Sequence, residues 1–190
     1  AVCWRDRCAA FDLGAETAQW LSDYLQGSVR LVRFDPRGKR RSDTKWTQEV
    51  EAFSRFSDAF PWLVISQASL DDLNSRLPAP LPMNRFRPNI VLDGVPSYAE
   101  DRVHELAIGA ARLRIVKPCT RCAITTTDQY TAPRDTDEPL RTLRRYRFSR
   151  ELKGVLFGQN AILLAGNGER MRVGQEIELS WKSAAPSEPA

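Results

Sequence analysis

Residues 111–116 constrain the fold more than any other stretch, because apolar and basic side chains alternate along them. Such alternation is typical of a β-strand with one face buried and the other in water. Other short apolar segments are separated by glycine, proline and asparagine turns, without a regular exchange of strands and helices. Many short strands and few helices together predict a mixed α/β, strand-dominated, barrel-like fold.

The individual elements are expected to be short. Strands are predicted over residues 2–11, 29–34, 62–65, 86–92, 106–109, 111–116, 123–127, 161–164 and 176–179. Helices are predicted over residues 12–25, after an N-cap at Ser66 or Ser69, and over 139–147, where proline comes first. The buried face of the first helix is predicted to consist of Ala18, Leu21, Tyr24 and Leu25. Residues 39–54 show no period and are predicted to form a loop, as are the polar residues 135–138.

The length of 190 residues suits one substantial domain. Serine, proline and alanine are frequent at its end, which predicts a disordered tail over residues 182–190. The sequence contains no apolar run long enough to span a bilayer and no signal-peptide pattern. Its four cysteines are too few for a secreted disulfide scaffold of this length, so a reducing, cytoplasmic location, most simply a bacterial one, is expected.

The charge balance gives only a weak argument for a polyanionic partner. Lysine and arginine number 28 and aspartate and glutamate 24, a net charge of +4. Residues 37–41 and 144–147 are local basic clusters that could hold a phosphate or a carboxylate, although such clusters are more often solvated surface. The aromatic residues are scattered like core residues, so no nucleic-acid partner is expected.

The pair Cys119 and Cys122 carries the densest chemistry in the chain, and three uses are open to it. Structural zinc needs four ligands, but the chain has one histidine, His104, and its other two cysteines lie at positions 3 and 8. A redox pair of thioredoxin type sits at the start of a helix, whereas residues 123–127 are predicted to form a strand.

The third use is a single thiolate given to a soft metal, with the other cysteine in support. The neighbouring cations Lys117 and Arg121 favour a thiolate or an anionic ligand, so this use fits best. His104 could act as a general base, but no nucleophile stands beside it, so a surface position is expected. Nucleophile-elbow, Walker and Rossmann motifs are absent from the sequence.

Several segments, taken in chain order, resemble one family. They are Phe86-Arg87-Pro88-Asn89-Ile90, Tyr98-Ala99-Glu100-Asp101, Ile108-Gly109, Lys117-Pro118-Cys119-Thr120-Arg121-Cys122 with Thr125-Thr126, Pro139-Leu140 with Thr142-Leu143 and Tyr146-Arg147, Phe157-Gly158-Gln159-Asn160, and Val173-Gly174. This series resembles the MOSC domain, and within it the mitochondrial amidoxime-reducing components and their bacterial N-hydroxylaminopurine-reducing relatives. The resemblance covers nearly the whole chain and implies a MOSC-type β-barrel with a few peripheral helices over residues 1–181.

The resemblance implies a molybdenum cofactor, molybdopterin, whose dithiolene supplies two sulfurs while one protein cysteine supplies a third. Motif by motif, that cysteine is Cys122. The same matching implies that the cofactor is lined by Ser57, Ala59, Phe60, Arg87, Asn89, Thr120 and Arg121. Asp58 is the candidate proton relay, although a purely structural role for its carboxylate is equally open.

The implied reaction is two-electron reduction of a small N-hydroxylated substrate, such as an amidoxime, a hydroxylamine or an N-hydroxylated base, with loss of water. Electrons are expected from a separate ferredoxin- or cytochrome-type protein, because no cysteine set follows residue 180. Family members usually begin with a further β-barrel segment, which this chain is expected to lack. Whether the chain retains the cofactor without that segment is then an open question.

A second function remains open within the same family. MOSC domains also occur fused to pyridoxal-phosphate-dependent enzymes that sulfurate the molybdenum cofactor. Cys122 would then carry a persulfide in a sulfur-carrier or cofactor-handling module. A third possibility is a binding module without catalysis.

Overall fold

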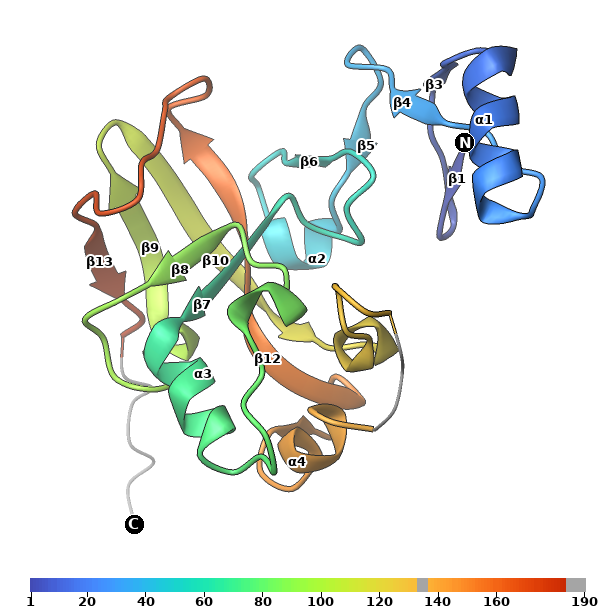
Figure 1. The fold of residues 1–190 in the computed structure, drawn as a ribbon. Helices are drawn as coiled ribbons and strands as arrows, with labels where there is room; N and C mark the ends of the chain where they lie inside the picture. The colour runs from blue at the N-terminus through green and yellow to red at the C-terminus, as the bar shows by residue number, and fades with distance from the viewer. Residues whose placement is uncertain (133–136, 184–190) are drawn as a thin grey trace. The chain divides into compact units, whose positions relative to one another are not determined.

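The computed structural model describes residues 1–132 and 137–183 (Figure 1). The chain divides into two compact units, Ala1–Pro61 and Trp62–Ala190. Most of the predicted tail and half of the predicted loop over 135–138 lie outside the described residues. Strands predominate over helices, which confirms the strand-dominated fold class.

The first unit consists of three two-stranded antiparallel sheets and two helices. The strand pairs are β1 (Val2–Cys3) with β2 (Asp6–Arg7), β3 (Ala10–Asp12) with β4 (Val32–Phe34), and β5 (Arg40–Arg41) with β6 (Phe53–Ser54). The helices are α1 (Ala15–Leu25) and α2 (Thr44–Thr47).

Two predictions for this unit are wrong. A single strand over 2–11 does not form, because the chain turns at Trp4, whose φ of 55° is left-handed, and pairs with itself. Residues 39–54 are not a plain loop: they hold β5, α2 and β6, and the Asp43 carboxylate caps α2 by accepting from the Lys45 amide at 2.9 Å. These elements are too short for a sequence period to reveal them.

Helix α1 is confirmed, but its predicted buried face is wrong. Of the four residues expected inside, only Ala18 is buried, whereas Tyr24 is 75% exposed. The Tyr24 ring instead stacks on Trp20, with centroids 5.8 Å apart. The two rings therefore cover each other on the helix surface.

A seven-stranded sheet forms the body of the second unit. The strands follow the order β13 (Glu178–Trp181), β9 (Val103–Ile108), β10 (Ala111–Thr120), β12 (Gly154–Ala165), β7 (Trp62–Ser66) and β8 (Ile90–Leu92), with β11 (Phe148–Ser149) paired to the start of β12. Among the strand pairs of the described residues, only β7 and β8 run parallel. The helices are α3 (Gln67–Asn74), α4 (Leu140–Arg144) and three single turns of 3₁₀-helix: η1 (Met83–Arg85), η2 (Ala99–Asp101) and η3 (Ala123–Thr126). Among the described helices, none has the length and hydropathy to cross a bilayer.

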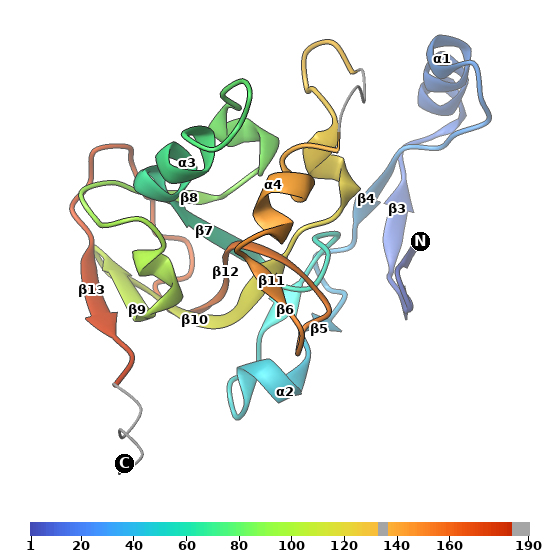
Figure 2. The same cartoon turned by 90° about the horizontal axis from the view of Figure 1, so that it is seen from below.

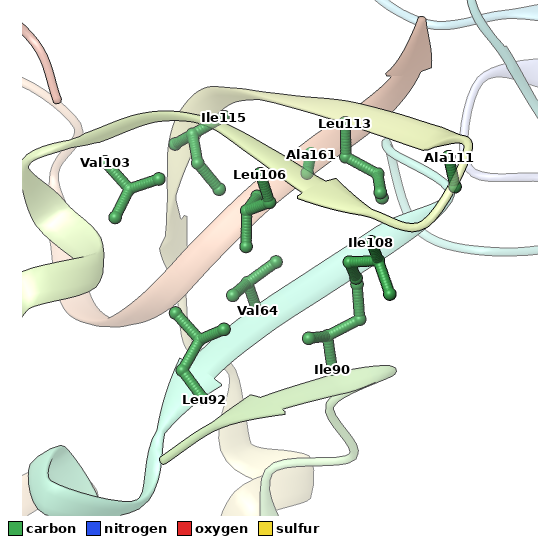
Figure 3. Close-up of a cluster of buried hydrophobic side chains, with 10 residues drawn as sticks. All are labelled: Val64, Ile90, Leu92, Val103, Leu106, Ile108, Ala111, Leu113, Ile115 and Ala161. Atoms are coloured by element: carbon green, nitrogen blue, oxygen red, sulfur yellow. The ribbon is translucent and has the colours of Figure 1, made fainter. Parts of the chain in front are cut away.

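The sheet is curled, so that side chains from strands far apart in its order share one core (Figure 3). Ile90 and Leu92 of β8 pack in the same cluster as Val103 and Leu106 of β9. Along β10 the predicted alternation is confirmed, since Ala111, Leu113 and Ile115 point into this cluster. A second buried cluster beneath α3 and α4 contains Ile65, Leu70, Leu73, Phe86, Leu143, Val155 and Phe157.

The N-cap predicted for α3 is confirmed. The Ser66 hydroxyl accepts from the Ser69 amide at 3.1 Å. The Ser69 hydroxyl in turn donates to the buried Glu100 carboxylate at 2.7 Å. The start of helix α3 is therefore hydrogen-bonded to Glu100, which belongs to one of the motifs named above.

The strand predicted over 123–127 is wrong, because residues 123–126 form η3. The Thr125 hydroxyl donates to the Cys122 carbonyl at 3.0 Å, and the Thr126 hydroxyl donates to the Ala123 carbonyl at 2.7 Å. Threonine side chains that bond to local carbonyls compete with strand pairing. The β-branched run therefore closes into a turn immediately after Cys122.

Candidate cofactor site at the end of β10

The two cysteines of the central pair occupy unequal positions. Cys119 lies within β10, half-buried, and its sulfur accepts a hydrogen bond from Arg121 Nη1 at 3.1 Å. Cys122 lies just beyond the strand, at the N-cap of η3, and its side chain is exposed. Both are free thiols. Cys122 is therefore the thiol that an incoming ligand can reach.

Arg121 joins this segment to the Phe-Arg-Pro-Asn motif. Its Nη2 donates to the Phe86 carbonyl at 2.7 Å, and its guanidinium lies 5.7 Å from the centroid of the Phe86 ring. Its Nε is buried and has no hydrogen-bond partner among the described residues. Arg121 thus brings together two motifs about 35 positions apart, centred on Arg87 and Cys122. The buried Arg121 Nε remains available there as a hydrogen-bond donor.

Arg87 projects from an unusual backbone conformation. Its φ is 56°, two residues after the end of η1, and its side chain is exposed. Because Pro88 follows, the right-handed helical conformation is disfavoured at Arg87, so η1 does not continue through it. A left-handed arginine costs about 1–2 kcal/mol relative to right-handed backbone. Arg87 is therefore an exposed cation on a strained turn beside Phe86.

Asn89 and Thr120 take different positions around this turn. The Asn89 Oδ1 accepts from the Leu63 amide at 2.8 Å, and the Asn89 amide donates to the Leu63 carbonyl at 2.9 Å. Asn89 thereby fastens the motif to β7. Thr120 is exposed at the end of β10, and a Cβ at Gly154 would lie 3.1 Å from its Cγ2. Glycine at position 154 thus leaves room for the Thr120 side chain.

The structure adds an ion pair that the sequence did not suggest. Arg85, which is buried, donates from Nη2 to Asp128 Oδ2 at 2.9 Å. Hydrogen bonds from the amides of Thr131 and Tyr130 hold the pKa of the Asp128 carboxyl below its usual range. The loop after η3 is thereby tied to η1, which directly precedes Phe86. The available signal was the sequence Asp-x-x-Thr, typical of a turn in which aspartate accepts from later amides.

We expect Asp128→Asn to loosen this loop and to lower the melting temperature by a few degrees, since it leaves the buried Arg85 guanidinium without its anion. Thermal unfolding followed by circular dichroism measures the effect. A lowered carboxyl pKa stabilises the fold at pH values above the pKa of the unfolded state, and this contribution is lost as the pH falls through the folded-state pKa. The difference in melting temperature between wild type and Asp128→Asn should therefore be present at neutral pH and disappear in acid.

The exposed Asp71 provides the matched control, because among the described residues its carboxylate accepts only from Gln67 on its own helix. Asp71→Asn should leave the melting temperature nearly unchanged. Equal effects of the two substitutions would show that the Arg85–Asp128 pair does not hold the loop.

The remaining predicted cofactor residues lie in the first unit, where buried Arg40 organises their backbone. Its guanidinium donates to the carbonyls of Ser57 and Asp58, the latter at 2.8 Å, and also pairs with Asp6 at 2.7 Å. The hydroxyls of Ser42 and Ser54 both donate to the Ala59 carbonyl, at 2.9 and 2.7 Å. The carbonyls of residues 57–59 are therefore all held by donors of the first unit.

The side chains of this segment differ in exposure. Phe60 is buried, and the Ser57 hydroxyl is buried with no partner among the described residues. The Asp58 carboxylate is exposed and accepts from Trp4 Nε1 at 3.2 Å. Cys122 belongs to the second unit, and the participation of these residues at its site stays a prediction.

Several residues of the matched motifs hold one another. Gln159 donates to Asp101 Oδ1 at 2.6 Å, and Arg147 pairs with Asp101 Oδ2 at 2.7 Å. The Arg147 guanidinium also lies 4.4 Å from the ring centroid of Tyr98. Burial, together with hydrogen bonds to Tyr146 and Asp72, raises the pKa of the Tyr98 hydroxyl. This network links α3, η2, the segment that follows α4, and β12.

The donor set around Cys122 fits the implied cofactor. A thiolate is the soft donor that molybdenum accepts, and an accessible cysteine can supply it. Arg87 follows Phe86 in the chain and Arg121 contacts Phe86. Both carry the planar donors that suit phosphate, and the Arg121 Nε, without a partner among the described residues, is one of these donors. His104, the other catalytic candidate considered, is exposed on β9.

Comparisons with known proteins identify the family of the chain. The model of the MOSC domain family matches residues 53–178. The chain is 41% identical over 179 residues to mitochondrial amidoxime-reducing component 1 of Mus musculus, covering 88% of this chain and 52% of the relative. It is 40% identical over 177 residues to the Homo sapiens component 1, with the same coverage. Against component 2 of Rattus norvegicus, identity is 42% over 142 residues, covering 72% of this chain and 42% of the relative.

The chain thus spans about half the length of the curated relatives that it matches. The family match extends from β6 to the first residue of β13 and includes the whole segment from the Phe-Arg-Pro-Asn motif to Cys122. The chain therefore belongs to the MOSC domain family.

Proposed function

We propose that this chain is the cofactor-binding part of a molybdenum-dependent reductase of N-hydroxylated compounds, with Cys122 as the protein ligand of the metal. The relatives named above as amidoxime-reducing components support the reaction class. The observation that carries the choice of ligand is the inequality of the cysteines: Arg121 engages the sulfur of Cys119, whereas Cys122 is exposed.

Different side chains of the chain would bind the metal and the pterin phosphate. The Cys122 thiolate would hold the metal, and Arg87 and Arg121 would bind the pterin phosphate through paired N–H donors. When bound, the cofactor supplies the two-electron chemistry that separates nitrogen from oxygen. The overall change consumes two electrons and two protons, breaks the N–O bond and releases water.

Proton supply and electron supply would come from different places. The exposed Asp58 carboxylate would pass protons to the departing oxygen, with Trp4 Nε1 fixing its orientation. Electrons would come from a separate ferredoxin- or cytochrome-type protein. A small N-hydroxylated molecule, such as an amidoxime, is the substrate class.

The test is to make the chain in a host that synthesises the molybdenum cofactor and in a host that cannot. We expect near-stoichiometric molybdenum by elemental analysis only from the first host, together with reduction of benzamidoxime to benzamidine by dithionite-reduced viologen. Chain that accepts labelled sulfur on Cys122 but holds no molybdenum would instead establish the sulfur-carrier function. Loaded chain that cannot reduce benzamidoxime, hydroxylamines or N-hydroxylated bases would overturn the reductase.

A further inference from the structure

A basic surface extends from the end of α4 to the β11–β12 turn. Its members are exposed and lie within ten residues of one another: Arg144, Arg145, Phe148, Arg150 and Lys153. Two further arginines of this region, at positions 141 and 147, are excluded because they pair with Glu138 and Asp101. Among the described residues, the four cations of the surface have no ion-pair partner, and only Glu151 adds a negative charge within residues 144–153.

An aromatic side chain lies within this basic surface. Phe148 is 45% exposed, and the Arg144 guanidinium lies 5.8 Å from the centroid of its ring. Arginine and aromatic residues are enriched where proteins bind one another, and lysine and glutamate are not. The combination favours a protein partner with an acidic face.

The position of the surface is fixed relative to Cys122 by strand pairing. Phe148 of β11 pairs with Val155 of β12, and the Val155 carbonyl accepts from the Arg121 amide at 2.8 Å. Neighbouring strands lie about 4.8 Å apart, so the backbones of Phe148 and Arg121 are separated by roughly 10 Å. Figure 2 shows α4 beside the segment that follows β10, in agreement with the packing of α4 on η3.

We propose that this basic surface is the docking site of the acidic electron-donor protein, an inference that rests on the proposed function. A donor must bring its redox centre close to the site it reduces, and the surface begins two strands from Cys122. Opposite charges steer such partners together and orient them. Each encounter would oxidise the donor by one electron, and two encounters would deliver the electron pair that the reaction consumes.

Other polyanions fit the surface less well. A nucleic-acid site would be expected to offer several aromatic rings for stacking, but Phe148 is the one aromatic member of this surface. An anionic membrane would be expected to contact a broader apolar face around the cations. Binding of a nucleic acid or of a membrane would not require the basic surface to lie near Cys122, whereas electron transfer does require it.

The first test measures binding and does not depend on the cofactor. A plant-type [2Fe–2S] ferredoxin of net negative charge is the probe, titrated into the chain by calorimetry at low and high salt. We expect binding that weakens as salt rises, and a roughly tenfold higher Kd for the double variant Arg145→Glu and Arg150→Glu. The neutral variants Arg145→Gln and Arg150→Gln should give an intermediate Kd, and circular dichroism checks that all of them fold.

Arg112→Glu is the matched control, because Arg112 is also exposed but lies at the opposite end of β10, about 26 Å from Thr120 at ~3.3 Å per residue. Arg112→Glu should change the Kd less than twofold, because salt screens the effect of an exposed charge that lies far from the binding surface. Equal losses in the control and in the double variant would overturn the proposal. So would stronger binding to single-stranded RNA or to phosphatidylserine vesicles than to ferredoxin, lost in the same variants.

The second test separates docking from the reaction itself. With loaded chain, the double variant should lose most of its turnover when ferredoxin supplies electrons but keep the wild-type rate with dithionite-reduced viologen. Absence of turnover with both donors in wild-type chain would count against the proposed function and not against the docking site, which the binding measurement still decides. Unchanged turnover of the double variant with ferredoxin would overturn the docking site alone.

Discussion

Cys122→Ser is expected to abolish molybdenum binding and substrate reduction, whereas Cys119→Ser is expected to retain most of both. The reason is the soft character of the thiolate donor, which a serine hydroxyl does not reproduce. Cys122 is exposed at the N-cap of η3, while the sulfur of Cys119 is engaged by Arg121. Molybdenum per chain, measured in both variants after expression in a cofactor-producing host, is the direct readout.

Thermal stability provides the control for this pair of variants. Serine at position 122 lies in water and is itself a good N-cap, so the melting temperature of Cys122→Ser should not fall. Cys119→Ser replaces a half-buried sulfur, and any loss of stability should appear there. Molybdenum retained by Cys122→Ser, or lost only by Cys119→Ser, would contradict the assignment of the ligand.

Gly158→Ala is expected to lower the free energy of unfolding by roughly 2–5 kcal/mol, the sum of left-handed strain and overpacking. Gly158 has a φ of 79° in the middle of β12. An added Cβ would lie 2.6 Å from Ile65 Cγ1 and 2.9 Å from the Val64 carbonyl oxygen. Neither neighbour can move freely, because both residues are fully buried in β7. Urea denaturation with a common m-value measures the loss.

Gly168→Ala separates the two causes of that loss. Gly168 has a φ of 90°, but a Cβ there would meet nothing within 4 Å. Its substitution should cost only the backbone strain, about 1–2 kcal/mol. If the two glycine variants lose equal stability, close packing of β12 on β7 is not the reason for glycine at position 158.

Local patterns predicted the elements that depend on local rules. The alternation over 111–116 correctly predicted a half-buried strand, because a strand places successive side chains on opposite faces. Ser66 was predicted as a cap because its hydroxyl suits a first-turn amide, and it caps α3. Predictions failed where two local tendencies compete: residues 123–127 are β-branched, yet their hydroxyls close a turn.

The site was predicted in part, and mostly through resemblance. The residues alone left zinc, redox and single-ligand uses of the cysteine pair open. The argument against a thioredoxin-type redox pair depends on a strand after Cys122, and that strand does not form. The ordered motifs singled out Cys122, and the structure shows the matching inequality in exposure. No local pattern predicts the pairing of Arg85 with Asp128, because it joins positions 43 residues apart.

The sequence by itself determined the strand-dominated fold class and, through the order of its motifs, the family. Only the tertiary structure decided which motif residues meet: Arg121 reaches Phe86, while Gln159, Asp101 and Arg147 hold one another. It also decided that the basic surface begins two strands from Cys122. The physical reason is that side-chain alternation is a local property of the backbone, whereas these contacts depend on the order and register in which distant strands pair.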